Sequence, residues 1–312
     1  MATNAKSISL DKAREDDAKF YWLDEGRSAG GFERQIDHST YQQGTHALFN
    51  GIKIVDCDTH FTEPPDLFEH NTPASLKGKM PRVVRTDAGD KWFIGDKDFG
   101  SLGGNVISKG RNKLLGKLAY TTYDDIHPGS YQVKPRLEEM DKMGIHAQVC
   151  FQNGGLTQAG SLLALNDIEL AMAVIRGYND ACAERMAESN NRIFCQATLP
   201  YWDEDLMNAE MRRCIDMGIK GVVLPDKPER LVAGYVRDDG KVNPFWEGVF
   251  EMANATGMPL NFHINSSLDA GSAIWEGLRF TQRLPINAML HTLGVCATMS
   301  NFMMSGILDK YE

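Results

Sequence analysis

The sequence predicts an α/β fold in which helices alternate with strands of a parallel sheet. From Pro135 onward, helical segments with regularly spaced apolar residues are followed by short apolar runs that are typical of buried strands. Glycines stand between several of these segments, as expected where a helix ends. Two architectures satisfy such an alternation: an open doubly wound sheet and a (β/α)8 barrel.

The alternation begins with a strand over 51–61, which must stop before Pro64 because proline has no N–H to donate. Residues 62–134 interrupt the rhythm as a long insertion, in which 81–95 is expected to form a β-hairpin with Gly89 at the turn. The later elements are expected in this order: a helix over 136–143, a strand over 145–151, a helix over 166–189, a strand over 192–199, a helix over 203–217 capped by Asp203, a strand over 219–224, a helix over 243–256, a strand over 259–265 and largely helical residues over 268–308.

The composition is that of a globular protein and excludes several classes. Of the 312 residues, 42% are hydrophobic and 24% are charged, which argues against overall disorder. The 33 Lys and Arg against 42 Asp and Glu give a formal net charge of −9, without the basic field of a nucleic-acid-binding domain. No apolar run approaches the roughly 18 residues that span a bilayer. The polar N-terminus also lacks the apolar core of a signal peptide.

From these features we expect a cytoplasmic protein with no nucleic-acid partner and no membrane partner. The six cysteines include no Cys-x-x-Cys pair and are expected to be reduced. Residues 1–50 are expected to form a polar N-terminal arm, either mobile or packed on a partner subunit, with one short helix near 10–23. Residues 51–312 are expected to form the catalytic domain.

The placement of polar residues favours the barrel over the open sheet. No Gly-x-Gly-x-x-Gly or Gly-x-x-x-x-Gly-Lys-Ser/Thr motif follows a predicted strand, so the nucleotide-binding form of the open sheet loses its main support. Polar residues instead follow the carboxyl ends of strands, where barrel enzymes place their chemistry.

Three of these polar residues form a candidate metal site. Asp58 and His60 are two residues apart on the first strand, so their side chains project to the same side of it. His263 lies near the end of the fifth predicted strand. One carboxylate and two imidazoles suit a divalent ion such as Zn²⁺, Mn²⁺ or Fe²⁺.

The run around this first pair resembles the opening motif of the amidohydrolase superfamily. The resemblance is to the amidohydrolase-related branch that contains aminocarboxymuconate-semialdehyde decarboxylase and several aromatic-acid decarboxylases. The matching segments are VDCDTHFTEPPDLF at 55–68, RLEEMDKMGI at 136–145, ATLP at 197–200, MGIKGV at 217–222, the strand that carries His263 and SGILDKY at 305–311.

The resemblance implies a (β/α)8 barrel with one catalytic divalent metal, held by Asp58 and His60 from strand one and His263 from strand five. Zinc is the expected ion, with manganese or iron as alternatives. Many relatives have His or Glu where Asp58 stands. The family also places a metal-binding Asp at the end of strand eight, whereas only five core strands are predicted here. A barrel that lacks its last strands has two open edges. We therefore expect either a fragment of a longer protein or a homodimer or higher homo-oligomer that covers the gap.

Four further residues are candidates for the site. His291 is expected on a helical segment, in a region where some relatives have a histidine that acts as acid or base. His127 and Tyr131 lie in the insertion and could reach over the site as a lid. Asn153 follows the second strand and is expected to touch the substrate.

Three functions remain open from the sequence. The first is non-oxidative decarboxylation of an aromatic or unsaturated carboxylic acid, with Asp58 and His291 as the catalytic pair. The second is hydrolysis of an amide, lactone or related acyl bond by a metal-bound hydroxide. The third is an inactive homologue that serves as an assembly partner. The first two require a small-molecule carboxylate or acyl substrate.

Overall fold

The computed structural model describes residues 33–34, 51–69, 72–102, 105–107, 109, 113–114, 122–263 and 274–311. The expected helix near 10–23, and nearly all of the expected N-terminal arm, lie outside these residues. Within the described part of the chain, no helix is both long enough and apolar enough to cross a membrane.

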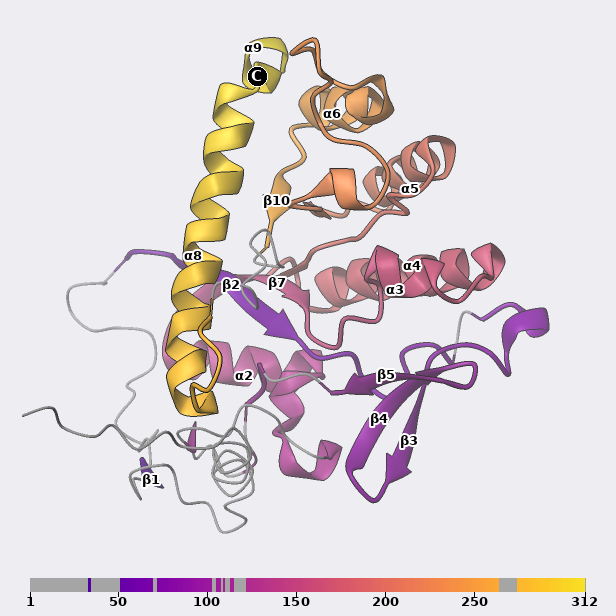
Figure 1. Ribbon diagram of the computed structural model, residues 1–312. Coiled ribbons are helices and arrows are strands. Elements are labelled where there is room, and N and C mark those ends of the chain that lie inside the picture. The colour runs from indigo at the N-terminus through magenta and orange to yellow at the C-terminus, as the bar shows by residue number, and fades with distance from the viewer. Residues whose placement is uncertain are drawn as a thin grey trace, which may run out of the picture.

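Five parallel strands follow one another in chain order, as the alternation predicts (Figure 1). β2 pairs with β7 and β7 with β8, β9 pairs with β10, and a parallel bridge between Ala197 and Val222 joins the two groups. Within the described residues the outer edges of β2 and β10 have no strand partner, so these five strands form an open array and not a closed barrel. The strands are β2 (Ile54–Phe61), β7 (Ile145–Gln152), β8 (Ile193–Cys195), β9 (Val222–Leu224) and β10 (Leu260–Phe262).

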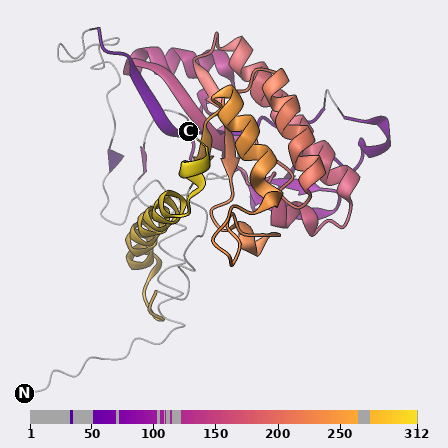
Figure 2. The same ribbon diagram turned by 90° about the horizontal axis from the view of Figure 1, so that it is seen from above.

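The helices lie on two sides of this array. α4, α5 and α6, which follow β7, β8 and β9, lie on one side of it, and the long helix α8 stands on the opposite side (Figures 1 and 2). The helices are α2 (Val133–Met143), α3 (Ala159–Leu163), α4 (Ile168–Glu188), α5 (Glu204–Asp216), α6 (Pro244–Thr256), α8 (Phe280–Met304) and α9 (Ile307–Lys310).

Local chemistry explains where these helices begin and end. The predicted cap at Asp203 is confirmed, because its carboxylate accepts a hydrogen bond from the Leu206 N–H at 2.9 Å. Asn243 caps α6 in the same way. Gly144 and Gly257 close α2 and α6 with positive φ angles of 72° and 67°, which glycine adopts without a Cβ clash.

The predicted hairpin is confirmed and is part of a three-stranded antiparallel sheet. β3 (Arg82–Thr86) pairs with β4 (Gly89–Ile94), and Gly89 follows the turn with φ of 108°. β5 (Lys97–Ser101), which the sequence did not predict, pairs with β4 on its other side. The remaining short elements are the pair β1 (Glu33–Arg34) and β6 (Lys113–Leu114) and the 3-10 helices η3 (Ala74–Leu76), η5 (Tyr123–Asp125), η6 (Pro128–Ser130) and η7 (Pro228–Arg230).

Two hydrophobic cores hold the fold together. The larger lies between the strand array and its helices, with Trp246, Met207 and Ile193 fully buried. The smaller joins the antiparallel sheet to α4 through Trp92 and Val174. The insertion over 62–134 therefore packs against the domain. It also keeps in place the loops that surround the carboxyl end of β2.

Candidate metal centre and its cavity

The fold brings Asp58, His60 and His263 together at the carboxyl ends of β2 and β10. One possible ligand atom from each residue lies within 4.8 Å of the others. Asp58 Oδ1 is 3.4 Å from His263 Nε2. The His60 and His263 rings meet edge to face with centroids 5.0 Å apart. Residues separated by about two hundred positions therefore converge on one point, as the spacing of the sequence motifs predicts.

Strand register sets the orientation of His60. In the β2–β7 pair, His60 is opposite Phe151, and the next residue, Phe61, is opposite Gln152. Side chains alternate along a strand, so His60 and Phe61 point to opposite faces. Phe61 is buried beneath the guanidinium groups of Arg136 and Arg185, at 5.4 Å and 4.7 Å from its ring centroid. The packing of Phe61 on the helix side therefore directs His60 to the side that carries His263.

A backbone hydrogen bond fixes which nitrogen of His60 is free. Nδ1 lies 2.7 Å from the carbonyl oxygen of Gln152. A carbonyl only accepts, so Nδ1 carries the proton and Nε2 keeps its lone pair. Burial lowers the pKa of His60 below its ordinary value, and the nearby His263 adds to this lowering, although the bond to Gln152 opposes it. His60 is thus held as a neutral imidazole, the form that binds a metal.

The donor set fits one divalent cation. Two imidazole nitrogens and a carboxylate oxygen suit zinc, manganese and iron alike. The Asp58 side chain is 73% exposed, whereas that of His263 is 21% exposed. A cation held by these three residues would therefore stay open on the Asp58 side, as a site that binds substrate requires.

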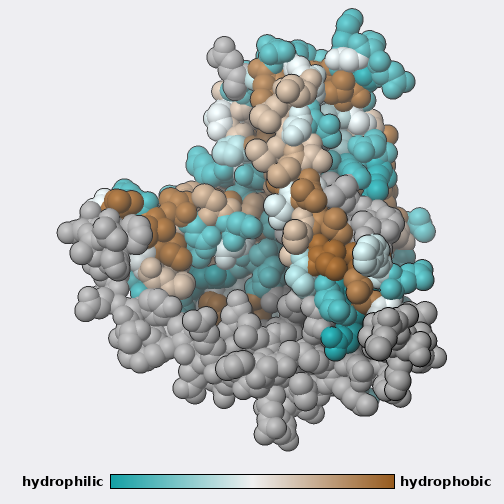
Figure 3. Space-filling model, turned by 60° about the vertical axis from the view of Figure 1, so that its left-hand side comes forward, coloured by the Kyte–Doolittle hydropathy of each residue, from teal (hydrophilic) through white to brown (hydrophobic). Residues whose placement is uncertain are grey.

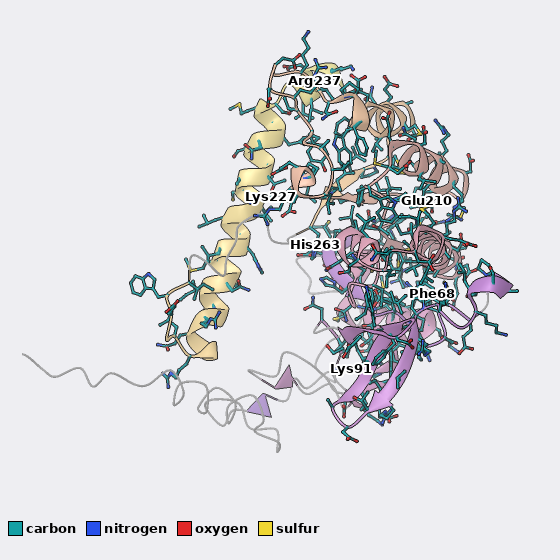
Figure 4. All side chains as sticks on the ribbon, turned by 45° about the vertical axis from the view of Figure 1, so that its right-hand side comes forward. Phe68, Lys91, Glu210, Lys227, Arg237 and His263 are labelled. Atoms are coloured by element: carbon teal, nitrogen blue, oxygen red, sulfur yellow. The ribbon has the colours of Figure 1, made fainter. Side chains whose placement is uncertain are left out.

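A cavity of about 630 Å³ lies beside the two histidines. It is bordered by the carboxyl ends of the strands and by the segments that follow β7 and β9. Phe151 forms part of the wall and packs against His263, with ring centroids 4.5 Å apart. Figure 4 shows Lys227 and His263 on the side of the strands that faces α8.

Two cations line this cavity without an acidic partner. Neither Lys227 nor Arg230 forms a side-chain ion pair within the described part of the chain, although both border the cavity. Their loop is held firmly, because the Tyr235 hydroxyl donates to the Pro225 carbonyl at 2.6 Å and Trp246 Nε1 donates to the Ala233 carbonyl at 3.0 Å. The same lining contains one acidic side chain, Asp226, so Lys227 and Arg230 leave this part of the rim with a surplus of one positive charge, which favours an anion.

Asn153 lines the same cavity, but its side chain is already engaged. Nδ2 donates to Thr62 Oγ1 at 2.9 Å and to the Leu102 carbonyl at 3.2 Å. Oδ1 accepts from the Asn105 N–H at 3.3 Å. The side chain therefore ties the end of β2 to the insertion, and any contact with a substrate would compete with these bonds.

The other three candidates lie elsewhere. His127 caps η6, where Nδ1 accepts from the Gly129 N–H at 3.0 Å. Tyr131 packs edge to face on Tyr123 and lines a different cavity of about 840 Å³. His291 is half-buried on α8. Among the described residues, none of the three belongs to the ligand set or to the 630 Å³ cavity.

Sequence reasoning missed a polar layer beneath the site and the cationic rim. Asn261 Nδ2 donates to Gln196 Oε1 at 2.6 Å, across Gly221. Asn261 is two positions before His263, so strand alternation could have placed both on one side. Lys227 follows the end of β9, and the rule that barrel chemistry follows strand ends could have selected it.

Comparisons with known proteins support the family resemblance. No family model matches the chain. It is 29% identical over 153 residues to the gamma-resorcylate decarboxylase of Rhizobium radiobacter, across 46% of this chain and 42% of that protein. It is 25% identical over 179 residues to the gamma-resorcylate decarboxylase of Rhodococcus jostii, across 55% of this chain and 52% of that protein. The chain thus spans about half the length of the curated relatives it matches.

A solved structure extends the likeness to the fold. An amidohydrolase from Mycobacterium avium subsp. paratuberculosis superposes with a TM-score of 0.58 at 19% identity, across 83% of this chain and 69% of that one. The likeness to this amidohydrolase is one of fold. Its sequence relatives are decarboxylases, which agrees with the resemblance seen in the sequence motifs. The amidohydrolase likeness agrees with five parallel strands in chain order.

Proposed function

We propose that the protein is a metal-dependent carboxy-lyase that removes CO₂ non-oxidatively from an aromatic or unsaturated carboxylic acid. The observation that carries the proposal is the convergence of Asp58, His60 and His263 beside a cavity that Lys227 and Arg230 line. The decarboxylase relatives support the same reaction. The chain spans about half the length of those relatives, so the activity of the whole protein is itself part of the proposal.

Asp58, His60 and His263 would hold one divalent cation, with zinc as the first candidate and manganese or iron as the others. When bound, the cation would withdraw electron density from a substrate carboxylate and a neighbouring oxygen. Contacts within the chain already hold two of these three side chains in position. His60 is fixed by Gln152, and His263 is held between the His60 and Phe151 rings.

The cationic rim would recognise the acid. Lys227 and Arg230 can each donate charged hydrogen bonds to a carboxylate or a phenolate. Phe151 offers an apolar ring at the cavity wall, which suits an aromatic substrate. In the reaction the carbon–carbon bond to the carboxylate breaks and CO₂ leaves. The electron pair of that bond takes a proton on carbon, and Asp58 and His291 remain the proposed groups for this transfer.

The partners of the protein would be a small-molecule carboxylate and further copies of the same chain. A small anionic substrate agrees with the size and the positive rim of the cavity. Self-association as a homodimer or higher homo-oligomer agrees with the two strand edges that have no partner within the described residues.

A direct assay tests the reaction. The full chain is loaded with Zn²⁺, Mn²⁺ or Fe²⁺ and incubated with 2,6-dihydroxybenzoate and other hydroxybenzoates, and both CO₂ and the decarboxylated phenol are measured. We expect equal amounts of the two products and their loss in Asp58→Ala. Cleavage of amides or lactones at a rate that rises with pH would favour the hydrolase instead. A metal-loaded protein with neither activity would favour an inactive homologue.

A further inference from the structure

The face of α8 that points away from the strand array is apolar and exposed. Met289 is 70% exposed and Leu293 is 58% exposed, and Met299, Met303 and Met304 are also more than half exposed. Figure 3 shows the hydrophobic side chains of α8 as a continuous band at the surface. We call these five residues, together with Cys296, the outer face of α8.

The opposite side of α8 carries both apolar and polar residues, and Phe302 packs there against Phe250 and Phe262. Asn287, His291, Gly294 and Thr298 are half-buried or buried there. A surface helix normally buries its apolar side and exposes its polar side. α8 is apolar on both sides, and its outer face is poorly suited to permanent contact with water.

The segment that contains α8 is also free of formal charge. From Leu284 to Leu308 the sequence has no Asp, Glu, Lys or Arg. The rest of the chain accounts for the net charge of −9, which opposes the close approach of two copies. The outer face of α8 is the exception, because two copies can meet there without bringing like charges together.

The spacing of the outer face suits a second helix of the same kind. Met289, Leu293, Cys296, Ser300 and Met303 follow one another at intervals of four, three, four and three residues. This is the repeat of the contact seam between two helices that pack side by side. A twofold interface requires a surface that is complementary to itself, and an uncharged apolar seam meets that condition.

We propose that the outer face of α8 is the surface through which two copies of this chain associate. The inference rests on the self-association proposed above and assigns it to one helix. The exposed parts of these side chains amount to roughly 500 Å² per copy, or about 1,000 Å² for two copies, which reaches the lower bound for a specific interface. Trp275, 82% exposed just before α8, adds to the apolar surface.

Light scattering after size-exclusion chromatography tests the proposal. We expect the full chain to elute as a dimer and Leu293→Glu to elute as a monomer, because the substitution buries an unpaired charge in the seam. Ile168→Glu is the matched control, since Ile168 is an exposed apolar residue on α4 and the added charge is the same. A dimer that survives Leu293→Glu would overturn the assignment to α8 while leaving self-association intact. A monomeric wild-type chain would overturn both.

Cross-linking gives a second and independent measurement. Cys296 lies in the middle of the seam, and Cys57 is the other exposed cysteine among those described. A short bis-maleimide should join two chains through Cys296, so Cys57→Ser keeps the cross-link and Cys296→Ser abolishes it. Cross-linking that depends on Cys57, or mixed higher oligomers in place of one dimer, would contradict the proposal.

Discussion

His60 on β2 donates its Nδ1–H to the carbonyl oxygen of Gln152 on β7, at 2.7 Å. The bond joins two neighbouring parallel strands at their carboxyl ends, so the orientation of the ring depends on the sheet rather than on a flexible loop. Such second contacts orient metal ligands and raise their basicity. The imidazole is therefore prepared for a cation by the register of β2 against β7.

Replacing Asp58 should remove metal binding. Asp58→Ala deletes the carboxylate that lies 3.4 Å from His263 Nε2 and leaves two neutral ligands. We expect the affinity for Zn²⁺ to fall at least tenfold, measured as metal retained after dialysis and as the dissociation constant from titration calorimetry. Asp66→Ala is the matched control, because Asp66 is an exposed acid outside the ligand set. Equal metal retention in the two variants would contradict the assignment of Asp58.

Replacing Lys227 should weaken the binding of an acid without loss of metal. Lys227→Gln removes an unpaired charge from the cavity, and a charged hydrogen bond of about 1.5–3 kcal/mol is worth roughly a tenfold to hundredfold change in the dissociation constant for 2,6-dihydroxybenzoate. Lys227→Arg should restore most of the affinity. Lys220→Gln is the control, since Lys220 is exposed and outside the cavity. If Lys227→Gln changed the dissociation constant no more than Lys220→Gln does, Lys227 would be excluded from substrate recognition.

The sequence predicted that Asp58, His60 and His263 lie together, because short-range rules place them. Two residues of separation put Asp58 and His60 on one face of β2, and the alternation of helices and strands ordered β2 to β10 in the array. The predicted cap at Asp203 was similarly local, since it involves an N–H three residues away. His263 joined the set because the fold places the ends of β2 and β10 near each other.

Features that depend on distant packing escaped the sequence. β5 could not be recognised, because Lys97–Ser101 lacks an apolar alternation and forms a strand only through its pairing with β4. The strand predicted over 192–199 is shorter in the structure. Only Ile193–Cys195 forms a strand, β8, and beyond it Ala197 makes a single β-bridge with Val222. The exposure of α8 was likewise hidden, because its composition is that of a buried helix.

Because Glu63 is buried, the free energy of unfolding should fall as the pH rises. Burial raises the pKa of its carboxyl above the ordinary value of 4.5, although the Asn153 and Gly154 N–H groups and the nearby Arg185 oppose this. With rising pH the unfolded chain loses this proton first, so the folded state binds more protons between 4.5 and its own pKa. In that window, the free energy of unfolding should fall by up to about 1.4 kcal/mol per pH unit through this group.

Glu63→Gln isolates that contribution. The amide cannot ionise, so the stability difference between wild type and variant, from urea unfolding, should shrink with rising pH and level off above the folded pKa. The variant itself should be less stable at acidic pH, since it offers one acceptor oxygen to two N–H donors, a loss of about 1–3 kcal/mol. Glu188→Gln, at an exposed position, should leave the pH dependence unchanged. A pH-independent difference for Glu63→Gln would show that folding does not change the pKa of this carboxyl.

Gly221 should tolerate no side chain, because the polar layer beneath the metal site occupies that space. A Cβ at this position would lie 2.1 Å from Gln196 Oε1 and 3.0 Å from Asn261 Nδ2. Gly221→Ala must therefore displace the Gln196–Asn261 pair, and we expect a loss of about 1–3 kcal/mol in urea unfolding. Gly160→Ala is the control: it meets no atom within 4 Å and lies in α3, where alanine favours the helix. Because the clash involves Gln196, the combined Gly221→Ala and Gln196→Ala variant should lose less than the sum of the single variants. A strictly additive pair would show that the close approach does not set the requirement for glycine.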